Sequence, residues 1–419
     1  MPMYYAPGIY VEEVSTGTKS IQPVGSSTAG FVGEAPLDTA HVNEAIAIEN
    51  WTRFTREFTQ EGSISTPLSH AVYGFFQNGG RRCYVVNTGK GQPIGGGGTS
   101  RRGLDVLEGI DEIAIVAAPG FTDPASYEAL LTHCENLKDR VAILDSALDV
   151  KSIDLLTKVA TSPVPRRTRG VAAAADGGDT AAAAAPSEPT GYRARTSPQG
   201  YGAQYWPWIT TRDPLSDKGD EVIVPPSGHM AGIYARTDAM RGVHKAPANE
   251  TVRGALNVSY QVTRDEQAEL NQVGINCIRF FTREGVLVWG ARTLADAASE
   301  WRYINVRRLF NLVEESIGLG TRWVVFEPND RTLWKSIERD IRAFLRLLWR
   351  DGALMGRTPE EAFFVQCNEE TNPPESIDAG IVMTRIGIAP VKPAEFVVFR
   401  IGQHAGGTIG AVPEGGANG

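Results

Sequence analysis

The stretch "PLSHAVYGFFQNGGRRCYVVNT", residues 67–88, contains the pattern of a helix followed directly by a strand. Its first part opens on a proline, carries apolar side chains and stops at Gly79 and Gly80, as helices that end at a glycine cap do. Its second part, from Cys83, is short and rich in β-branched and aromatic residues, which is typical of a strand. This succession predicts one unit of an α/β sheet.

The same alternation continues on both sides of this stretch. We expect a strand over 28–33, a strand over 111–120, a helix over 124–139 and a strand over 140–147. Short apolar strands between amphipathic helices indicate a mainly parallel sheet that is covered on both faces. The run "YGAQYWPWITTRD", from residue 201, is predicted to continue the series.

Two segments interrupt the series. Residues 89–103, "GKGQPIGGGGTSRRG", form a Gly-rich loop, and residues 163–200 are a low-complexity, Ala-rich excursion. The second segment is long for a loop inside a compact domain, so a disordered or surface insertion is expected there.

After about residue 280 the pattern changes to that of an α+β domain. The expected elements are a strand over 285–292, a helix over 296–317, a strand over 322–328, a helix over 331–352 and strands within 360–367 and 382–402. The helix over 331–352 has apolar residues on one face at a spacing of 3.6. Asp330 is the predicted N-cap and Gly352 the predicted residue after the C-cap.

Composition and charge exclude several classes of protein. The chain has 419 residues, 42% of them hydrophobic, and a formal net charge of −8, which favours neither nucleic acid nor anionic lipid as a partner. The N-terminus lacks the basic and apolar regions of a signal peptide, and no run approaches 18 apolar residues. We therefore expect assembly in the cytoplasm, no nucleic-acid partner and no membrane insertion.

Sequence motifs typical of catalysis, cofactor binding or metal binding are scarce. In the Gly-rich loop Lys90 precedes the glycines, whereas a phosphate-binding loop needs its lysine after them. The four cysteines are scattered and the histidines never lie at a metal-binding spacing. Ser227, His229 and Asp238 lie close together in the sequence and could suggest the catalytic triad of a hydrolase. A loop that leads into a helix accounts for the same residues more simply. No catalytic, cofactor-binding or metal-binding residue is predicted, and the chain is not expected to be an enzyme.

One helix has an unusual distribution of charge. Five cations on the helix over 331–352 follow intervals of 4, 3, 4 and 4 residues and form a basic ridge beside the apolar face: Lys335, Arg339, Arg342, Arg346 and Arg350. A solvated surface would explain the ridge, but such surfaces usually mix both signs of charge. Contact with an acidic partner is the alternative.

Both ends of the chain carry an apolar strand pattern. The N-terminal one comprises Ile9, Tyr10, Val11, Glu12, Glu13 and Val14, and the C-terminal one comprises Phe396, Val397, Val398, Phe399, Arg400 and Ile401. A free strand exposes unpaired backbone groups that invite pairing with another chain. If each strand adds to a sheet edge of a neighbouring copy, head-to-tail repetition builds an open filament or tube.

Several motifs together resemble one known family. The segments "YYAPGIYVEEV", "HAVYGFFQNGGRRCYVVN", "AIVAAPGFTD", "GIYARTDAMRGVHKAPANE", "WRYINVRRLFNLVEESI", "WVVFEPNDRTLW", "LWRDGALMGRTPEEAFFVQCNEETNPPE" and "GIAPVKPAEFVVFRIGQ" are similar to contractile tail sheath proteins of phages and phage-tail-like particles. The resemblance covers nearly the whole chain outside 89–103 and 163–200. The compact length is most similar to sheaths of extracellular contractile injection systems and R-type pyocins.

The resemblance implies a structural role and a domain plan. It implies hexameric rings stacked around an inner tube, with baseplate and cap proteins as further partners, and a contraction that drives the tube through a target envelope. The implied plan is an N-terminal linking arm over 1–25, an outer subtilisin-like α/β domain over 26–280, an inner α+β domain over 285–395 and a linking strand with a Gly-rich tail over 396–419. In that plan the terminal strands are exchanged between neighbours, and the basic ridge is a candidate contact with the inner tube or with a sheath neighbour.

Two other functions remain open at the level of sequence. A non-contractile tube or filament protein would share the terminal strands, and an α/β hydrolase would need a polar pocket and neither terminus. Sequence also leaves open whether the particle is a phage tail, a cytoplasmic injector or one released extracellularly.

Overall fold

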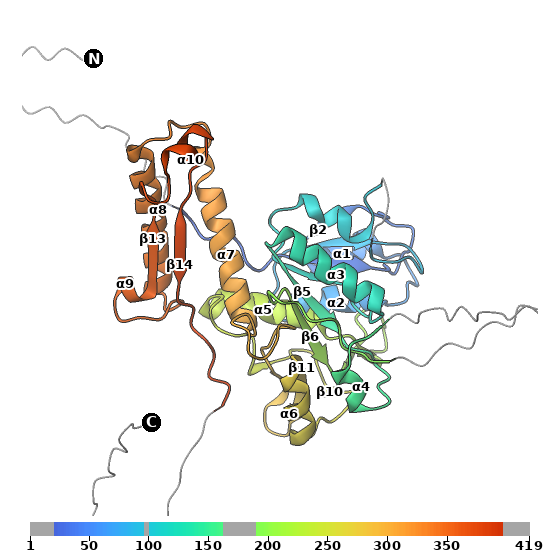
Figure 1. Ribbon diagram of the computed structural model, residues 1–419. Helices are drawn as coiled ribbons and strands as arrows, with labels where there is room; N and C mark the ends of the chain where they lie inside the picture. Colours follow the sequence, from blue (N-terminus) through green and yellow to red (C-terminus); the bar gives the residue numbers. More distant parts are fainter. Residues whose placement is uncertain (1–20, 96–99, 162–189, 397–419) are drawn as a thin grey trace, which may run out of the picture.

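A computed structural model describes residues 21–95, 100–161 and 190–396, which fold into a large lobe and a small lobe (Figure 1). The large lobe contains the elements from β1 to β12, and the small lobe contains those from α7 onward. The helix α7, Ile304–Gly320, runs from the large lobe into the small one.

A nine-stranded sheet forms the centre of the large lobe, in the order β2-β3-β1-β4-β5-β6-β11-β12-β9. Its strands are β1 Ala29–Gly33, β2 Ala45–Ile48, β3 Cys83–Asn87, β4 Ile115–Ala117, β5 Val141–Asp145, β6 Gly202–Trp206, β9 Glu250–Thr251, β11 Ile275–Phe281 and β12 Gly285–Trp289. All pairings from β3 across to β11 are parallel, whereas β2, β12 and β9 pair in the antiparallel sense. The predicted, mainly parallel sheet is therefore confirmed.

Alternate side chains of the central strands pack on opposite helix layers. In β5, Ile143 belongs to the core shared with α2 and α5, while Leu144 belongs to the core shared with α3. The helices and short helical turns of this lobe are α1 Trp51–Phe58, α2 Pro67–Gln77, η1 Gly103–Gly109, α3 Pro124–Leu137, α4 Ile153–Thr157, α5 Ser227–Arg241 and α6 Arg264–Gln272. A smaller sheet joins β10 Asn257–Val258, β7 Ile209–Arg212 and β8 Glu221–Val224.

Glycines allow α2 and α5 to pack very closely. A Cβ atom on Gly228 would lie 2.2 Å from the Ala71 Cα atom, and one on Gly232 would lie 2.5 Å from the Phe75 carbonyl oxygen. Real Cβ atoms do not approach backbone this closely, so a larger residue at either position would force the helices apart.

The small lobe packs two long helices against a two-stranded sheet. It comprises α7, η2 Arg322–Val324, α8 Arg331–Arg350, α9 Pro359–Ala362, β13 Phe363–Gln366, α10 Pro374–Asp378 and β14 Arg385–Ile388. The apolar face of α8 supplies more of its core than any other element does, with Ile341, Phe344 and Leu345 almost fully buried. The predicted caps of α8 are confirmed: the Asp330 side chain accepts a hydrogen bond from the Leu333 amide, and Gly352 has a positive φ of 78°.

Three boundaries expected from the sequence need correction. The strand at residues 285–292 belongs to the large sheet, because β12 pairs with β11, so the division expected between 280 and 285 falls inside a hairpin. The helix expected from 296 begins at Ile304. The strand expected over 322–328 is instead η2 and a turn, in which Phe326 has a φ of 70° and is fully exposed.

Among the described residues, no helix combines the length and the apolar character that crossing a bilayer requires.

Candidate assembly surface

The sheet of β13 and β14 has two outer edges, and its register fixes which backbone groups point outward. Phe363 lies opposite Ile388 and Val365 opposite Ile386. In the next pair along the same register, the Ala389 amide donates to the Ala362 carbonyl over 2.9 Å. Because hydrogen-bonded pairs alternate in an antiparallel ladder, the backbone groups of Phe363, Val365, Ile386 and Ile388 point away from the partner strand.

The outward edge of β14 is open. Among the described residues no hydrogen bond reaches the amide or the carbonyl of Ile386 or Ile388. Both side chains pack on the core of the small lobe but remain only half-buried. On the other face of the sheet, Gly387 lies under the Phe364 ring, since a Cβ on Gly387 would meet that ring at 2.1 Å.

The outward edge of β13 is partly closed. The Phe363 amide donates to the Pro359 carbonyl of α9, and the Val365 carbonyl accepts a 2.8 Å hydrogen bond from Nη2 of Arg342. Arg342 also donates to Glu338 one turn earlier on α8, over 2.9 Å. Arg342 is thus held between its own helix and the edge of the sheet.

The five cations of the predicted basic ridge lie on α8, on the face away from the core rather than beside it. Lys335, Arg339, Arg346 and Arg350 are exposed, and Arg342 is half-buried. Arg339 makes a 3.1 Å hydrogen bond to the neighbouring Asp340. Arg342 therefore hydrogen-bonds the edge of the sheet, whereas the other four cations face outward.

A shallow groove runs along the first turns of this helix. It has a volume of about 350 Å³ and is lined by Arg331, Thr332, Lys335, Ser336 and Arg339. Its lining consists of cations and hydroxyl groups, which favour an acidic partner.

The chain that leaves β14 is fixed to the large lobe at Glu395. Arg292 binds both carboxylate oxygens, at 2.8 and 2.7 Å, and Asn271 and Tyr303 donate to the same carboxylate. Burial acts to raise the pKa of Glu395, but the hydrogen bonds from Arg292 and Asn271 outweigh it and lower the pKa. Glu395 is consequently held as a carboxylate on the large lobe, one residue before the predicted C-terminal strand.

The start of the described chain is fixed to the small lobe. Ile21 is buried against Gly320 at the end of α7, and the Val24 amide donates to Ser316 over 3.0 Å. The predicted strand at residues 9–14, and residues 397–401 of the C-terminal one, lie outside the described residues. Phe396 is described, is not in a strand and has an exposed fraction of 75%.

A buried ion pair joins the two lobes. Arg308 of α7 donates to both carboxylate oxygens of Asp238 on α5, at 2.8 and 2.5 Å, and its guanidinium lies 4.8 Å from the Tyr234 ring centroid. Arg308 also donates to the Ser26 carbonyl, and the Ser26 hydroxyl donates to Asp238. One side-chain cluster therefore connects α7, α5 and the segment that precedes β1.

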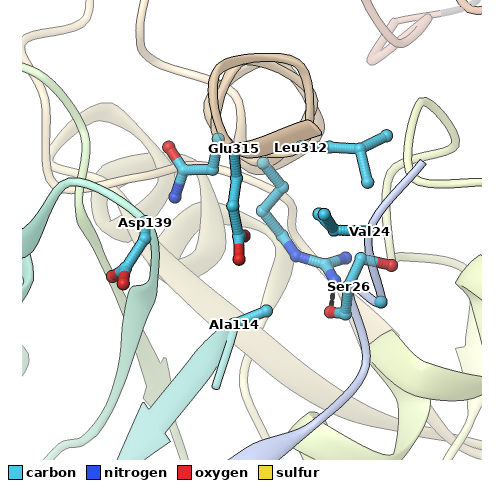
Figure 2. Close-up of a pocket in the computed structure, with 9 residues that line it drawn as sticks. Val24, Ser26, Ala114, Asp139, Leu312 and Glu315 are labelled. Carbon is cyan, nitrogen blue, oxygen red and sulfur yellow. Dashed lines mark hydrogen bonds between the residues drawn. The ribbon is translucent and has the colours of Figure 1, made fainter. Parts of the chain in front are cut away.

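Beside this pair, α7, the large lobe and residues 24–26 line a small, partly open cavity (Figure 2). Its volume is about 10 Å³, close to the room needed by one water molecule. Glu315 extends into it from α7 toward Ala114 of the large lobe, and Asp139 lies to one side (Figure 2). Burial, together with the charge of Asp139, raises the pKa of Glu315 to about 7.

The residues considered for hydrolysis do not form a catalytic triad. The Ser227 hydroxyl donates to the buried carboxylate of Asp145 over 2.7 Å, and Asp238 forms an ion pair with Arg308. Both ring nitrogens of the fully buried His229 lack a hydrogen-bond partner. The described part of the chain contains no cluster of three or more His, Cys, Asp or Glu side chains suited to a metal ion, and the four cysteines are free and buried.

Sequence reasoning did not identify Glu395, Arg308 or Glu315. Their partners lie far away in the chain: 103 residues separate Arg292 from Glu395, and 70 residues separate Asp238 from Arg308. No local motif marks such pairs.

Two family models match the chain in succession. The phage tail sheath protein central domain matches residues 108–294, and the phage tail sheath C-terminal domain matches residues 296–403. The boundary between them agrees with the structure, in which β12 closes the large lobe.

Solved contractile sheaths match the chain over nearly its full length. The helical sheath of the anti-feeding prophage (AFP) in its contracted state is 30% identical, with a TM-score of 0.70, over 96% of this chain and 100% of that one. The PVC sheath complex of an extracellular contractile injection system, also contracted, is 29% identical, with a TM-score of 0.71, over 97% of this chain and 99% of that one.

Curated relatives are matched over part of their length. The tail sheath protein of Vibrio phage KVP40 is 30% identical over 42% of this chain and 26% of its own length. The putative prophage major tail sheath protein of Pseudomonas aeruginosa strain UCBPP-PA14 is 30% identical over 42% of this chain and 45% of its own. These relatives are structural sheath proteins and not enzymes. The chain belongs to the contractile tail sheath family of phages and phage-like injection systems.

Proposed function

We propose that this protein polymerises as stacked hexameric rings around an inner tube and contracts to drive that tube through a target envelope. The observation that carries the proposal is the full-length match to an AFP sheath captured in its contracted state. A structure of the six-fold symmetrised AFP baseplate, which this chain also matches at 30% identity, supports a sixfold ring.

The links between subunits are proposed to be exchanged strands at the two termini, residues 9–14 and 396–401. Two features support this arrangement: the small sheet has an open edge at β14, and Glu395 holds the start of the C-terminal strand on the other lobe. A strand added to an open edge gains a ladder of hydrogen bonds, each contributing about 0.5–1.5 kcal/mol net. Many such links would keep the cylinder connected while its subunits move.

The large lobe is proposed to be the outer, subtilisin-like domain, and the small lobe the inner one. The run of parallel strands covered by helices on both faces suits that assignment, which concerns the fold alone. Ser227 hydrogen-bonds Asp145 rather than a histidine, so the assignment brings no protease activity.

The inner tube is proposed to contact the outward cations of α8: Lys335, Arg339, Arg346 and Arg350. They are exposed and border the groove at the start of the helix, which supports contact with an acidic surface. Individual exposed ion pairs contribute only about 0.2–1 kcal/mol, so contraction can break them in succession. Baseplate and cap proteins complete the proposed particle, which would assemble in the bacterial cytoplasm and either remain a phage tail or be released.

Electron microscopy of the purified chain, with and without the inner tube protein, tests this function. The full-length protein should form cylinders of two diameters, extended and contracted, and deletion of residues 1–14 should abolish them while leaving a folded monomer. Cylinders of one diameter under every condition would instead indicate a non-contractile tube. Monomers from the full-length chain, even with the tube protein present, would overturn the proposal.

A further inference from the structure

We propose that a turn of the small lobe holds the Phe326 side chain outward as an anchor for a second copy of this chain. Phe326 acts together with its neighbour Val325 and with two side chains beside the turn, Ile381 and Met383. These four residues are called the apolar patch. The inference rests on the proposed self-assembly of the protein, and it concerns a surface separate from both termini and from the cations of α8.

The backbone of Phe326 has a conformation that large side chains avoid. Its φ of 70° lies in the left-handed region, which is exceptional for a bulky residue. Such a conformation raises the free energy of the folded chain and persists at places where function requires it. The exposed fraction of Phe326 is 103%, so the ring gains no packing within the described part of the subunit that would offset the strain. A strained backbone therefore holds a large aromatic ring in solvent.

A second unfavourable feature lies in the same turn. The indole N–H of Trp323 is buried and has no hydrogen-bond partner among the described residues. Trp323 and Val324 pack on the core of the small lobe, whereas Val325, with an exposed fraction of 64%, projects away from it beside Phe326. A buried donor without a partner destabilises the folded state. The stability of a single subunit therefore does not explain the conformation of this turn.

Two further apolar side chains lie beside the turn. The Asn329 side chain donates to the Ile381 carbonyl over 3.2 Å, which places the segment before β14 next to the turn. Ile381 and Met383 have exposed fractions of 52% and 54%, whereas Val382 between them packs on the core. Asn372 hydrogen-bonds both the amide and the carbonyl of Met383 and so fixes this segment. The apolar patch thus consists of exposed side chains on a well-anchored backbone.

The direction of Ile381 and Met383 separates the apolar patch from the cations of α8. Val382 and Ile386 alternate with these two side chains and point toward the core, where the apolar face of α8 lies. Ile381 and Met383 consequently point away from α8, whereas the outward cations lie on the far side of that helix. A tube bound on the α8 side would leave Ile381 and Met383 facing a different neighbour.

A second copy of this chain is the occupant that suits the apolar patch. None of its four side chains carries a charge, so the patch does not complement the acidic surface proposed for the inner tube. Apolar and aromatic side chains of this size favour burial against another apolar surface. The matched AFP chain comes from a helical sheath, and in a helical sheath each subunit has other copies of itself as neighbours.

Two variants at one position separate the anchor from the strain. Phe326→Ala removes the ring alone, and Phe326→Gly also relieves the backbone, because glycine adopts a positive φ readily. We expect both variants to need a protein concentration at least about tenfold higher to form cylinders in electron micrographs, because the burial of one phenylalanine is lost. The unfolding midpoint of Phe326→Gly should equal or exceed that of the parent protein. A merely structural role would not weaken assembly while preserving stability.

Lys138→Gly is the matched control. Lys138 is exposed, has a φ of 63° at the end of α3 and lies in the large lobe, so the change relieves the same kind of backbone conformation. This variant should assemble like the parent protein. The inference would be overturned if Lys138→Gly weakened assembly as much as Phe326→Gly, or if both Phe326 variants assembled normally.

A photo-crosslinker identifies the occupant. With p-benzoylphenylalanine in place of Phe326, irradiation of cylinders should join two copies of this chain, detected as a dimer and mapped by peptide mass spectrometry. Crosslinks to the inner tube protein alone would overturn the choice of occupant. A parent chain that forms no cylinders with the tube protein would refute the proposed function and this inference together, whereas normal cylinders without the Phe326 ring would refute this inference alone.

Discussion

At the scale of single residues, we expect Glu315 to make the stability of the protein depend on pH. Its pKa is raised by burial and by Asp139 to about 7, against an ordinary value of 4.5. A carboxyl group with a raised pKa in the folded state favours folding below its unfolded pKa, and this contribution is lost as the pH rises toward 7. Stability should therefore fall between about pH 4.5 and pH 7.

The variant Glu315→Gln should remove this pH dependence, because glutamine resembles the protonated acid. At pH 8 we expect a free energy of unfolding about 1–2 kcal/mol above that of the parent protein, allowing for the partial exposure of the group. At pH 4.5 the two proteins should be equal. Urea denaturation at both pH values measures the difference, with Glu327→Gln as the exposed control. A pH-independent difference would contradict the assignment.

Individual residues were predictable where their role is local. Asp330 and Gly352 were identified as caps because a cap acts on amides and carbonyls a few residues away. Arg342 was predicted only as one of five cations, since its contact with Val365 depends on how α8 packs on β13. Spacing along a helix places side chains on a face, but it does not reveal what that face touches.

At the scale of elements, the outward cations of α8 should act as a group. We expect the double variant Lys335→Glu with Arg346→Glu to lose binding to the inner tube protein, because it turns two attractive charges into repulsive ones. Cosedimentation at low salt measures the effect, and binding by the parent protein should itself weaken as salt rises. Arg283→Glu, on the exposed β11–β12 turn, is the matched control. Unchanged cosedimentation of the double variant would exclude this face.

Long periodic elements were predicted well and short apolar ones less well. The helix α8 and the alternation from β1 to β5 carry many consecutive signals that agree. Residues 322–328 have strand composition but form η2 and a turn, because a short apolar run fits more than one structure. The strand β12 was identified, yet its place beside β11 was missed although Gly285, with a φ of 79°, marks the tight turn of a hairpin.

At the scale of the whole molecule, the Arg308–Asp238 pair should hold the lobes together. Arg308 is fully buried, so Asp238→Ala would leave an unpaired charge inside the protein. Breaking a buried pair in this way costs about 3–5 kcal/mol.

Asp111→Ala offers a matched control, because the Arg322–Asp111 pair also joins the lobes, at 3.6 Å, but both of its side chains are exposed. Removing an exposed pair changes stability by about 1 kcal/mol or less. Equal unfolding midpoints for the two variants would contradict this role.

The arrangement of the lobes could not be predicted from the sequence. It depends on contacts such as Arg308 with Asp238 and Arg292 with Glu395, whose partners are brought together only by the completed fold. The family resemblance supplied the general plan, and the structure supplied the contacts that position Ile21 and Glu395, close to the two ends of the described part of the chain.

If the C-terminal strand is exchanged as proposed, the hydrogen bonds between Arg292 and Glu395 would determine where mechanical load enters the subunit. Tension on the chain beyond residue 396 would reach these two hydrogen bonds first, and Arg292 lies three residues after the end of β12 in the large sheet. Tension on the N-terminal arm enters at Ile21 and Val24 against α7 of the small lobe. If the two termini link neighbouring copies as proposed, the two tethers would pull on different lobes, and a neighbour that moves away at one end would transmit its force across the Arg308–Asp238 junction before it reaches the other.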